Sequence, residues 1–276
     1  MSARLNDLRE AARQNRLDTA AMFMAAGNGH FGSCFSCTEI VVALYFAIMR
    51  IDPARPDWPD RDRFILGKGH AAPTLYSALI RRGFMPESWI GEFETHVGSR
   101  LMTHPSRRYQ PGVDASQGSL GHGLSVGAGM ALAGALDGKD YRVTVLLGDG
   151  ELHEGSVWEA AAFAAKYRLA NLVAVVDRNR LCVDGATDDV LPLEPLAARW
   201  ESFGWEALTV DGHDLSALIE VLDPPRRGGT RPRVVIAETV KGRGASFMEG
   251  VRSWHSDAIT PEQYARLVAE LAEPLP

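Results

Sequence analysis

The sequence predicts an α/β protein with a doubly wound, mainly parallel sheet that carries helices on both faces. Short, largely apolar runs at 64–66, 143–147, 172–176 and 233–238 alternate with segments of helical periodicity. Such uninterrupted apolar strands are typical of parallel strands that are buried on both faces. The chain has 276 residues, of which 46% are hydrophobic, so it can bury a sizeable core. We expect one domain over residues 1–276.

Helical patterns fill most of the remaining sequence. We expect helices over 5–26, 36–50, 72–82, 124–136, 156–167, 195–203 and 214–222, and a terminal helix that starts at Thr260 with Pro261 in its first position. Ser36 and Ser156 each precede a Glu by three residues, which is the spacing of a capping box. The segment 95–120 has little periodicity, and a long loop inside a compact domain is usually functional.

The composition argues against several classes of protein. The formal net charge is −6 and no more than two basic residues stand in a row, so an electrostatic footprint for nucleic acid is lacking. The longest apolar run, near Ile40–Met49, is too short to span a bilayer. The charged N-terminal segment lacks the apolar region of a signal peptide. We therefore expect a cytoplasmic protein that binds neither nucleic acid nor membrane.

Cys34 and Cys37 have the spacing of a redox or zinc site. Cys182 is the third cysteine of the sequence, so a second pair of zinc ligands is missing. The pair also opens a helical pattern, whereas a redox pair of this kind would follow a strand. We expect both cysteines to be small buried residues.

The most informative chemistry lies at the ends of two neighbouring apolar runs. Asp149 stands between Gly148 and Gly150 directly after the run 143–147, and Asn179 follows the next run. The carboxyl ends of adjacent parallel strands meet at the edge where doubly wound sheets bind ligands. Carboxylate and amide oxygens suit Mg2+, which takes its remaining ligands from phosphate and water. Taken alone, Gly-Asp-Gly is also compatible with a simple tight turn, but the paired Asn179 favours a metal site.

The same residues carry a resemblance to a known family. Gly148-Asp149-Gly150, followed about thirty residues later by Asn179, resembles the thiamine-diphosphate motif. The wider resemblance covers roughly residues 15–260 and is to the N-terminal half of transketolases, whose motifs occur here in the same order. These motifs are Gly29-His30-Phe31-Gly32-Ser33, Gly67-Lys68-Gly69-His70, His104-Pro105, Pro111-Gly112-Val113-Asp114, Gly118-Ser119-Leu120-Gly121, Lys241-Gly242-Arg243-Gly244 and Trp254-His255.

The resemblance implies a thiamine-diphosphate-binding fold and a role for each matched position. Mg2+ would be held by Asp149, Asn179 and the main-chain carbonyl of Leu181. Thiamine diphosphate would be contacted by His70, Gly118, Ser119, Leu120, Gly148, Asp149, Gly150, Glu154 and Asn179. The catalytic residues would be His30, His70, His104 and His255. The helix that starts near Gly121 could offer N–H groups to the diphosphate, and Glu154 and Glu159 resemble carboxylates near a subunit interface.

The resemblance also implies an activity and a partner. Transketolase-type enzymes pass a two-carbon ketol unit from a ketose or ketose phosphate to an aldehyde. Full-length members carry a second, pyrimidine-binding domain that activates the cofactor ring, and no sequence is left here to build it. We therefore expect one subunit of a split transketolase that needs a C-terminal, pyrimidine-binding partner chain, assembled as an α2β2 heterotetramer.

Other functions stay open at this point. The chain could belong to another thiamine-diphosphate enzyme, similar to 1-deoxyxylulose-phosphate synthase or to the α subunit of a 2-oxo acid dehydrogenase, although Gly67–His70 and His104-Pro105 favour transketolase. It could also be a non-catalytic, cofactor-binding remnant. A nicotinamide-dependent dehydrogenase is disfavoured, because the glycines of 121–127 have the wrong spacing and do not follow a strand.

Three positions depart from the family's pattern. His122 and His153 stand where Gln is common, and Phe31 stands where Pro or a branched aliphatic residue is common. We expect these changes to leave the cofactor site intact and to bear on the substrate or the interface. His153 and His213 themselves we expect to be structural or solvated.

Overall fold

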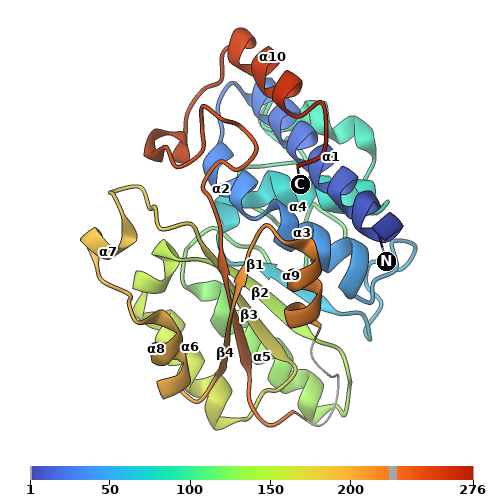
Figure 1. Ribbon diagram of the computed structural model, residues 1–276. Helices are drawn as coiled ribbons and strands as arrows, with labels where there is room; N and C mark the ends of the chain where they lie inside the picture. Colours follow the sequence, from blue (N-terminus) through green and yellow to red (C-terminus); the bar gives the residue numbers. More distant parts are fainter. Residues whose placement is uncertain (1, 224–228, 276) are drawn as a thin grey trace.

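The computed structural model describes residues 2–223 and 229–275. Its centre is a five-stranded parallel sheet with the strand order β1-β2-β3-β5-β4 (Figure 1). The strands are β1 (Arg63–Leu66), β2 (Val143–Gly148), β3 (Leu172–Arg178), β4 (Glu206–Asp211) and β5 (Arg233–Glu238). The predicted α/β class with a parallel sheet is confirmed. The extent of the domain, residues 1–276, stays a prediction.

The helices lie close to where the periodicity predicts them. They are α1 (Ser2–Ala26), α2 (Phe31–Ser36), α3 (Thr38–Ala43), α4 (Ala72–Arg81), α5 (His122–Leu136), α6 (Gly155–Lys166), α7 (Thr187–Val190), α8 (Leu196–Ser202), α9 (Leu215–Leu222) and α10 (Pro261–Glu270). The helix expected over 36–50 is instead α3 followed by a π-helical turn, Leu44–Ile48. Within the described residues, no helix combines the length and the apolar character needed to cross a bilayer.

Two hydrophobic cores flank the sheet, because successive residues of a strand point to opposite faces. Val173 and Val175 belong to the core that is shared with α1–α4 and α9. Ala174 and Val176 belong to the other core, which α5, α6 and α8 complete. Figure 1 shows these two helical layers on either side of the strands. The uninterrupted apolar runs therefore arise, as predicted, because the strands are buried on both faces of the sheet.

The two predicted capping boxes are wrong. The hydroxyl of Ser36 donates to Oδ2 of Asp177 at 2.6 Å, and α3 starts after Cys37 without a side-chain cap. The hydroxyl of Ser156 donates to the carbonyl of Gly121 at 3.1 Å, and α6 likewise lacks a side-chain cap. In both cases the serine hydroxyl bonds to a residue distant in the sequence, and it does not cap the helix as the local pattern predicts.

Strand β4 was not predicted. It lies at the edge of the sheet, and only one of its six residues, Val210, is buried. Its sequence therefore lacks the continuous apolar run that identifies the other strands. The prediction for the first two cysteines is confirmed, since Cys34 and Cys37 are fully buried. Burial raises the pKa of Cys34 to about 11 and that of Cys37 to about 12, so both remain thiols.

Candidate functional site

The turns that follow β2 and β3 lie side by side, as the sequence predicts. Gly148 pairs with Asp177 in the parallel register of these two strands. The N–H of Asp149 donates to the carbonyl of Asp177 at 3.2 Å. The N–H of Arg180 in turn donates to Oδ2 of Asp149 at 2.5 Å. These bonds join the Gly-Asp-Gly turn to the turn that carries Asn179.

An oxygen-rich pocket results at this edge of the sheet. Asp149 is 2% exposed, and burial together with the nearby charge of Asp177 raises its pKa to about 6. The side-chain oxygen of Asn179 accepts from the N–H of Leu181 at 3.1 Å, which fixes the turn. Within the described part of the chain, no three His, Cys, Asp or Glu side chains converge as a metal cluster. The expected magnesium ligands are not such a cluster, because they comprise one carboxylate, one amide and one main-chain carbonyl.

Lys241 contacts one of the expected metal ligands. Its ammonium donates to the main-chain carbonyl of Leu181 at 3.2 Å and lies 3.2 Å from Nδ1 of His255. Burial, followed by repulsion from Lys68, lowers the pKa of Lys241 to about 8. The carbonyl assigned to the metal by resemblance is thus one that already faces positive charge. The oxygen donors are of the kind that bind a divalent cation, whose charge would repel this ammonium.

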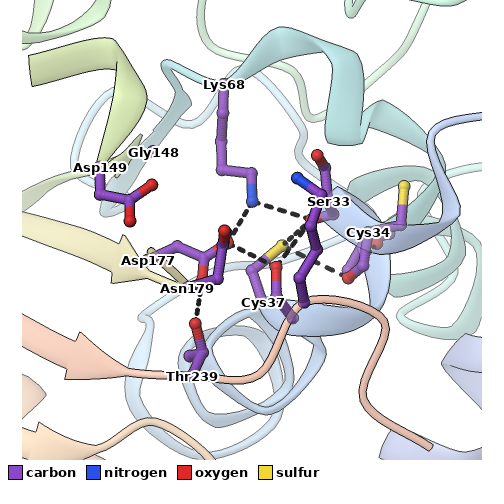
Figure 2. Close-up of polar contacts among 12 residues, drawn as sticks. Ser33, Cys34, Cys37, Lys68, Gly148, Asp149, Asp177, Asn179 and Thr239 are labelled. Atoms are coloured by element: carbon purple, nitrogen blue, oxygen red, sulfur yellow. Dashed lines mark hydrogen bonds and ion pairs between the residues drawn. The ribbon is translucent and has the colours of Figure 1, made fainter. Parts of the chain in front are cut away.

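A buried polar network lies beneath the pocket (Figure 2). The ammonium of Lys68 donates to Oδ2 of Asp177 and, at 2.8 Å, to the carbonyl of Ser33. The same carboxylate accepts from the hydroxyls of Ser36 and Thr239. Although burial opposes charge, this pairing raises the pKa of Lys68 and lowers that of Asp177, so both stay ionised. Lys68 lies within one of the motifs quoted above, but no role was predicted for either residue.

Glu151 is another buried group for which no role was predicted. It is 2% exposed, and its two carboxylate oxygens accept from the N–H groups of Gly121, at 2.9 Å, and Gly148, at 3.1 Å. Gly121 is the residue that precedes the first turn of α5. The N–H of Gly121 is therefore donated to Glu151, so any contact between this helix end and a diphosphate would use later N–H groups.

Three of the four predicted catalytic histidines form a cluster. The ring centroids of His30, His70 and His255 lie 5.3 to 5.6 Å apart. His104 is more exposed, and it packs against the glycines at positions 69 and 118. Burial lowers the pKa of each of the four, and that of His255 falls to about 4. All four imidazoles are therefore neutral near pH 7, able both to donate and to accept a hydrogen bond.

A cavity of about 290 Å³ joins these features. The predicted site residues that line it are His70, Leu120, Gly148, Asp149, Gly150, Glu154, Asn179, Leu181 and His255. His30, His104, Gly118 and Ser119 lie outside its lining. Residues without a predicted role also line it, among them Ser33, Lys68, Glu151, Cys182 and Lys241. Glu151 and Cys182 directly follow predicted site residues, whereas Ser33, Lys68 and Lys241 lie within the quoted motifs without a predicted role.

The positions that depart from the family's pattern have different surroundings. Phe31 is fully buried and packs between Phe23, tilted at 4.6 Å, and Trp254, edge-on at 5.7 Å between ring centroids. His153 lines the cavity, and its Nε2 lies 3.0 Å from the carbonyl of Leu191. His122 is exposed in the first turn of α5. The larger aromatic at position 31 thus fills a core, away from the site.

His213 has the structural role that was expected. Its Nε2 accepts from the N–H of Val240 at 2.9 Å, which leaves the proton on Nδ1. Nδ1 lies 2.9 Å from Glu39, a buried carboxylate that Arg16 also pairs with. The imidazole therefore ties the segment after β5 to α3.

Comparison with known proteins decides the family. A family model described as the thiamine diphosphate binding domain of transketolase matches residues 8–272. The chain belongs to the transketolase family. This transketolase chain is 42% identical over 265 residues to one subunit of the apulose-4-phosphate transketolase of Phocaeicola vulgatus, covering 95% of this chain and 92% of that protein. It is 40% identical over 271 residues to the 6-deoxy-6-sulfo-D-fructose transketolase subunit SqwG of a Clostridium species, covering 98% of each.

Full-length relatives are longer than this transketolase chain. Human transketolase is 40% identical over 273 residues, which cover 97% of this chain and 42% of the human protein. A crystal structure of Pichia stipitis transketolase in complex with sedoheptulose 7-phosphate superposes with a TM-score of 0.90 at 30% identity, covering 96% of this chain and 40% of that one. The predicted thiamine-diphosphate-binding fold and cofactor are confirmed by these matches, and Mg2+ is the usual companion of that cofactor in transketolases.

Proposed function

We propose that this chain is the cofactor-binding subunit of a split transketolase. With a pyrimidine-binding partner chain, it transfers a two-carbon ketol unit from a ketose or ketose phosphate to an aldehyde, using thiamine diphosphate and Mg2+. The observation that supports this most directly is the convergence of the Asp149 and Asn179 turns with a histidine cluster at one cavity. Relatives matched over nearly their whole length are named transketolase subunits, which supports the division into two chains.

Asp149, Asn179 and the carbonyl of Leu181 would hold the metal ion. Their oxygens are of the type that Mg2+ prefers. Residues Gly148 and Gly150 expose main chain beside the carboxylate, so a diphosphate can approach closely. Thiamine diphosphate, when bound, supplies the nucleophilic carbon for breaking and forming the carbon–carbon bond.

The histidines would bind substrate hydroxyls and move protons. Nδ1 of His255 lies 3.2 Å from the ammonium of Lys241, so Nδ1 is an acceptor and the ring proton is on Nε2. Nε2 of His255 can then donate to a hydroxyl of the sugar. His30 lies beside it, and His104 is more exposed than either. Neutral imidazoles suit the binding of hydroxyls, because each can both donate and accept a hydrogen bond.

The partner would cover the outer face of α5 and α6. Glu154 and Glu159 are exposed on the single chain, so neither carries the cost of burial until a partner is bound. Gly129 on α5 is likewise exposed, and a Cβ added there would meet no atom within 4 Å. A small, exposed helix face of this kind allows close approach by another chain. We propose two copies of this chain with two of the partner, and the cofactor held between unlike chains.

Activity measured with and without the partner tests the proposal. The purified chain with Mg2+, thiamine diphosphate, a ketose donor and an aldehyde acceptor should show no turnover, whereas the co-purified pair should be active. Product analysis with ketose phosphates, hydroxypyruvate and pyruvate separates ketol transfer from the chemistry of related thiamine-diphosphate enzymes. Normal turnover by the chain alone would contradict the split arrangement. Inactivity of the pair with every donor would instead support a non-catalytic, cofactor-binding remnant.

A further inference from the structure

We infer that Glu151 is a positioning residue that holds the Gly118–Leu120 loop in register with the metal-binding turn Gly148–Gly150. This inference rests on the proposed function, because it assumes that these two segments contact the diphosphate and the metal. Glu151 would act through its main-chain partners and would not contact the reacting atoms. Its contribution to the cofactor site would be to fix the relative position of these two segments.

The geometry of the carboxylate carries the inference. Oε1 accepts from the N–H of Gly121 at 2.9 Å, and Oε2 accepts from the N–H of Gly148 at 3.1 Å. One donor directly follows the Gly118–Leu120 loop, and the other begins the Gly-Asp-Gly turn. The side chain is 2% exposed, so water does not compete for either bond. Two segments that are distant in the sequence are thus joined through one buried group.

Both bonds need an oxygen acceptor, one on each side of the carboxyl group. Each of its two oxygens accepts from a main-chain N–H, whereas a glutamine would turn an NH2 group toward one of these donors. The carboxyl group also lies at the N-terminus of α5, where it accepts from the N–H of Gly121, the residue before the first helical turn. A glutamate therefore suits position 151 through its two acceptor oxygens as well as through its length.

The backbone around Glu151 has little room to adjust. Gly121 adopts φ +85°, and a Cβ there would come within 2.6 Å of Cβ of Glu154. A Cβ on Gly67 would come within 2.9 Å of Oε1 of Glu151, and a Cβ on Gly123 within 2.9 Å of Cα of Gly67. Three chain segments, at the ends of β1 and β2 and at the start of α5, therefore meet at this carboxylate. A change in its length or charge must move at least one of them.

Cofactor affinity and turnover, measured separately, test the inference. The protein is the co-purified complex with its partner chain, and the probe is thiamine diphosphate titrated calorimetrically in the presence of Mg2+. We expect Glu151→Gln to weaken binding about tenfold, because one hydrogen bond is lost and one buried donor is left unpaired. At saturating cofactor, kcat should return to near the wild-type value, as a group that only positions the loops predicts.

Two further variants keep the test decisive. Glu151→Asp keeps a carboxyl group but is one methylene shorter, so it should keep only one of the two bonds and bind cofactor more weakly than the wild type. This variant replaces Glu151→Gln in the test if Glu151→Gln does not fold. Asp114→Asn is the matched control, because Asp114 is a buried carboxylate that accepts from the N–H of Phe64 at 2.9 Å away from the cavity. It should lower the melting temperature and leave cofactor affinity unchanged.

The possible outcomes are distinct. Wild-type affinity in both Glu151 variants, or equal weakening in Asp114→Asn, would overturn the positioning role. A lower kcat at saturating cofactor with unchanged affinity would also overturn it. If the wild-type complex itself fails to bind thiamine diphosphate, the proposed function fails, and that result is separate from any comparison among the variants.

Discussion

The ammonium of Lys68 is bonded to the carboxylate of Asp177, and neither side chain is more than 2% exposed. Lys68 follows β1 and Asp177 lies near the end of β3, so the pair spans β2, which lies between them. The hydroxyls of Ser36 and Thr239 also donate to the carboxylate. An ion pair between residues on either side of β2 thus stabilises the floor of the cavity.

Removal of Lys68 should destabilise the fold. Lys68→Met leaves the carboxylate of Asp177 buried without its counter-charge, which costs about 3–5 kcal/mol in comparable buried pairs. Urea denaturation of the isolated chain measures this. The control is Lys139→Met, because Lys139 and Asp60 form an ion pair in which each side chain is 40% exposed, and such pairs contribute about 1 kcal/mol or less. Equal effects of the two substitutions would mean that the buried pair has no special role.

Removal of the expected magnesium ligands should abolish cofactor binding without unfolding the chain. Asp149→Ala and Asn179→Ala each delete an oxygen donor from a turn at the strand ends, so neither opens a large cavity in the core. Calorimetric titration of thiamine diphosphate with Mg2+ into the assembled complex is the measurement. Asn171→Ala is the control: its amide donates to the carbonyl of Ala131 at the opposite end of β3. Unchanged affinity in both ligand variants would show that Gly-Asp-Gly is only a turn.

Stability should fall with acid through the range set by His255. Burial lowers the pKa of His255 from about 6.5 to about 4 in the folded chain. Below pH 6.5 the unfolded chain binds a proton that the folded chain does not, so the free energy of unfolding decreases as pH falls toward 4. His255→Asn removes this contribution, and the difference between wild type and variant should grow over that interval. A difference that is constant from pH 7 to pH 4 would contradict the pKa shift.

Bulk on the exposed face of α5 should prevent assembly. Gly129→Arg adds a long cation where the isolated chain has open space, so the fold should persist while the proposed interface is blocked. Light scattering of the co-expressed pair should show a heterotetramer for wild type and smaller species for the variant. Glu220→Arg, on the exposed side of α9, is the control and should still assemble. A wild-type pair that is fully active as a one-to-one heterodimer would rule out the α2β2 arrangement.

The part of the fold that the sequence predicts is the part with strong periodicity. Strands such as β3 are buried along their whole length, and their apolar runs mark them directly. Strand β4 could not be predicted from an apolar run, because it is an edge strand with mixed exposure. Capping boxes show the limit of local patterns. Thr260 and Gln263 form a reciprocal box that was not predicted, whereas the hydroxyls of Ser36 and Ser156 bind elsewhere.

Some residues of the candidate site could likewise be predicted from the sequence, and others could not. Asp149 and Asn179 follow apolar runs, so their meeting at one edge is a consequence of parallel pairing. Glu151 has no such indication, because its partners are main-chain N–H groups of glycines whose proximity only the folded chain provides. The glycines of α5 also differ in ways that only the folded chain reveals. Gly127 packs against Val145 of the chain's own sheet, while Gly129, two residues later, is exposed.

The ends of the sheet have a consequence for the chain before it meets a partner. An unpaired strand edge can recruit a strand from another molecule and start aggregation. Here one end of the strand order is β1, which has four residues, and the other is β4, which begins with Glu206 and finishes with Asp211. A short edge and an acidic edge both discourage strand addition. The two edges of the sheet therefore discourage the isolated chain from associating with further copies of itself by strand addition.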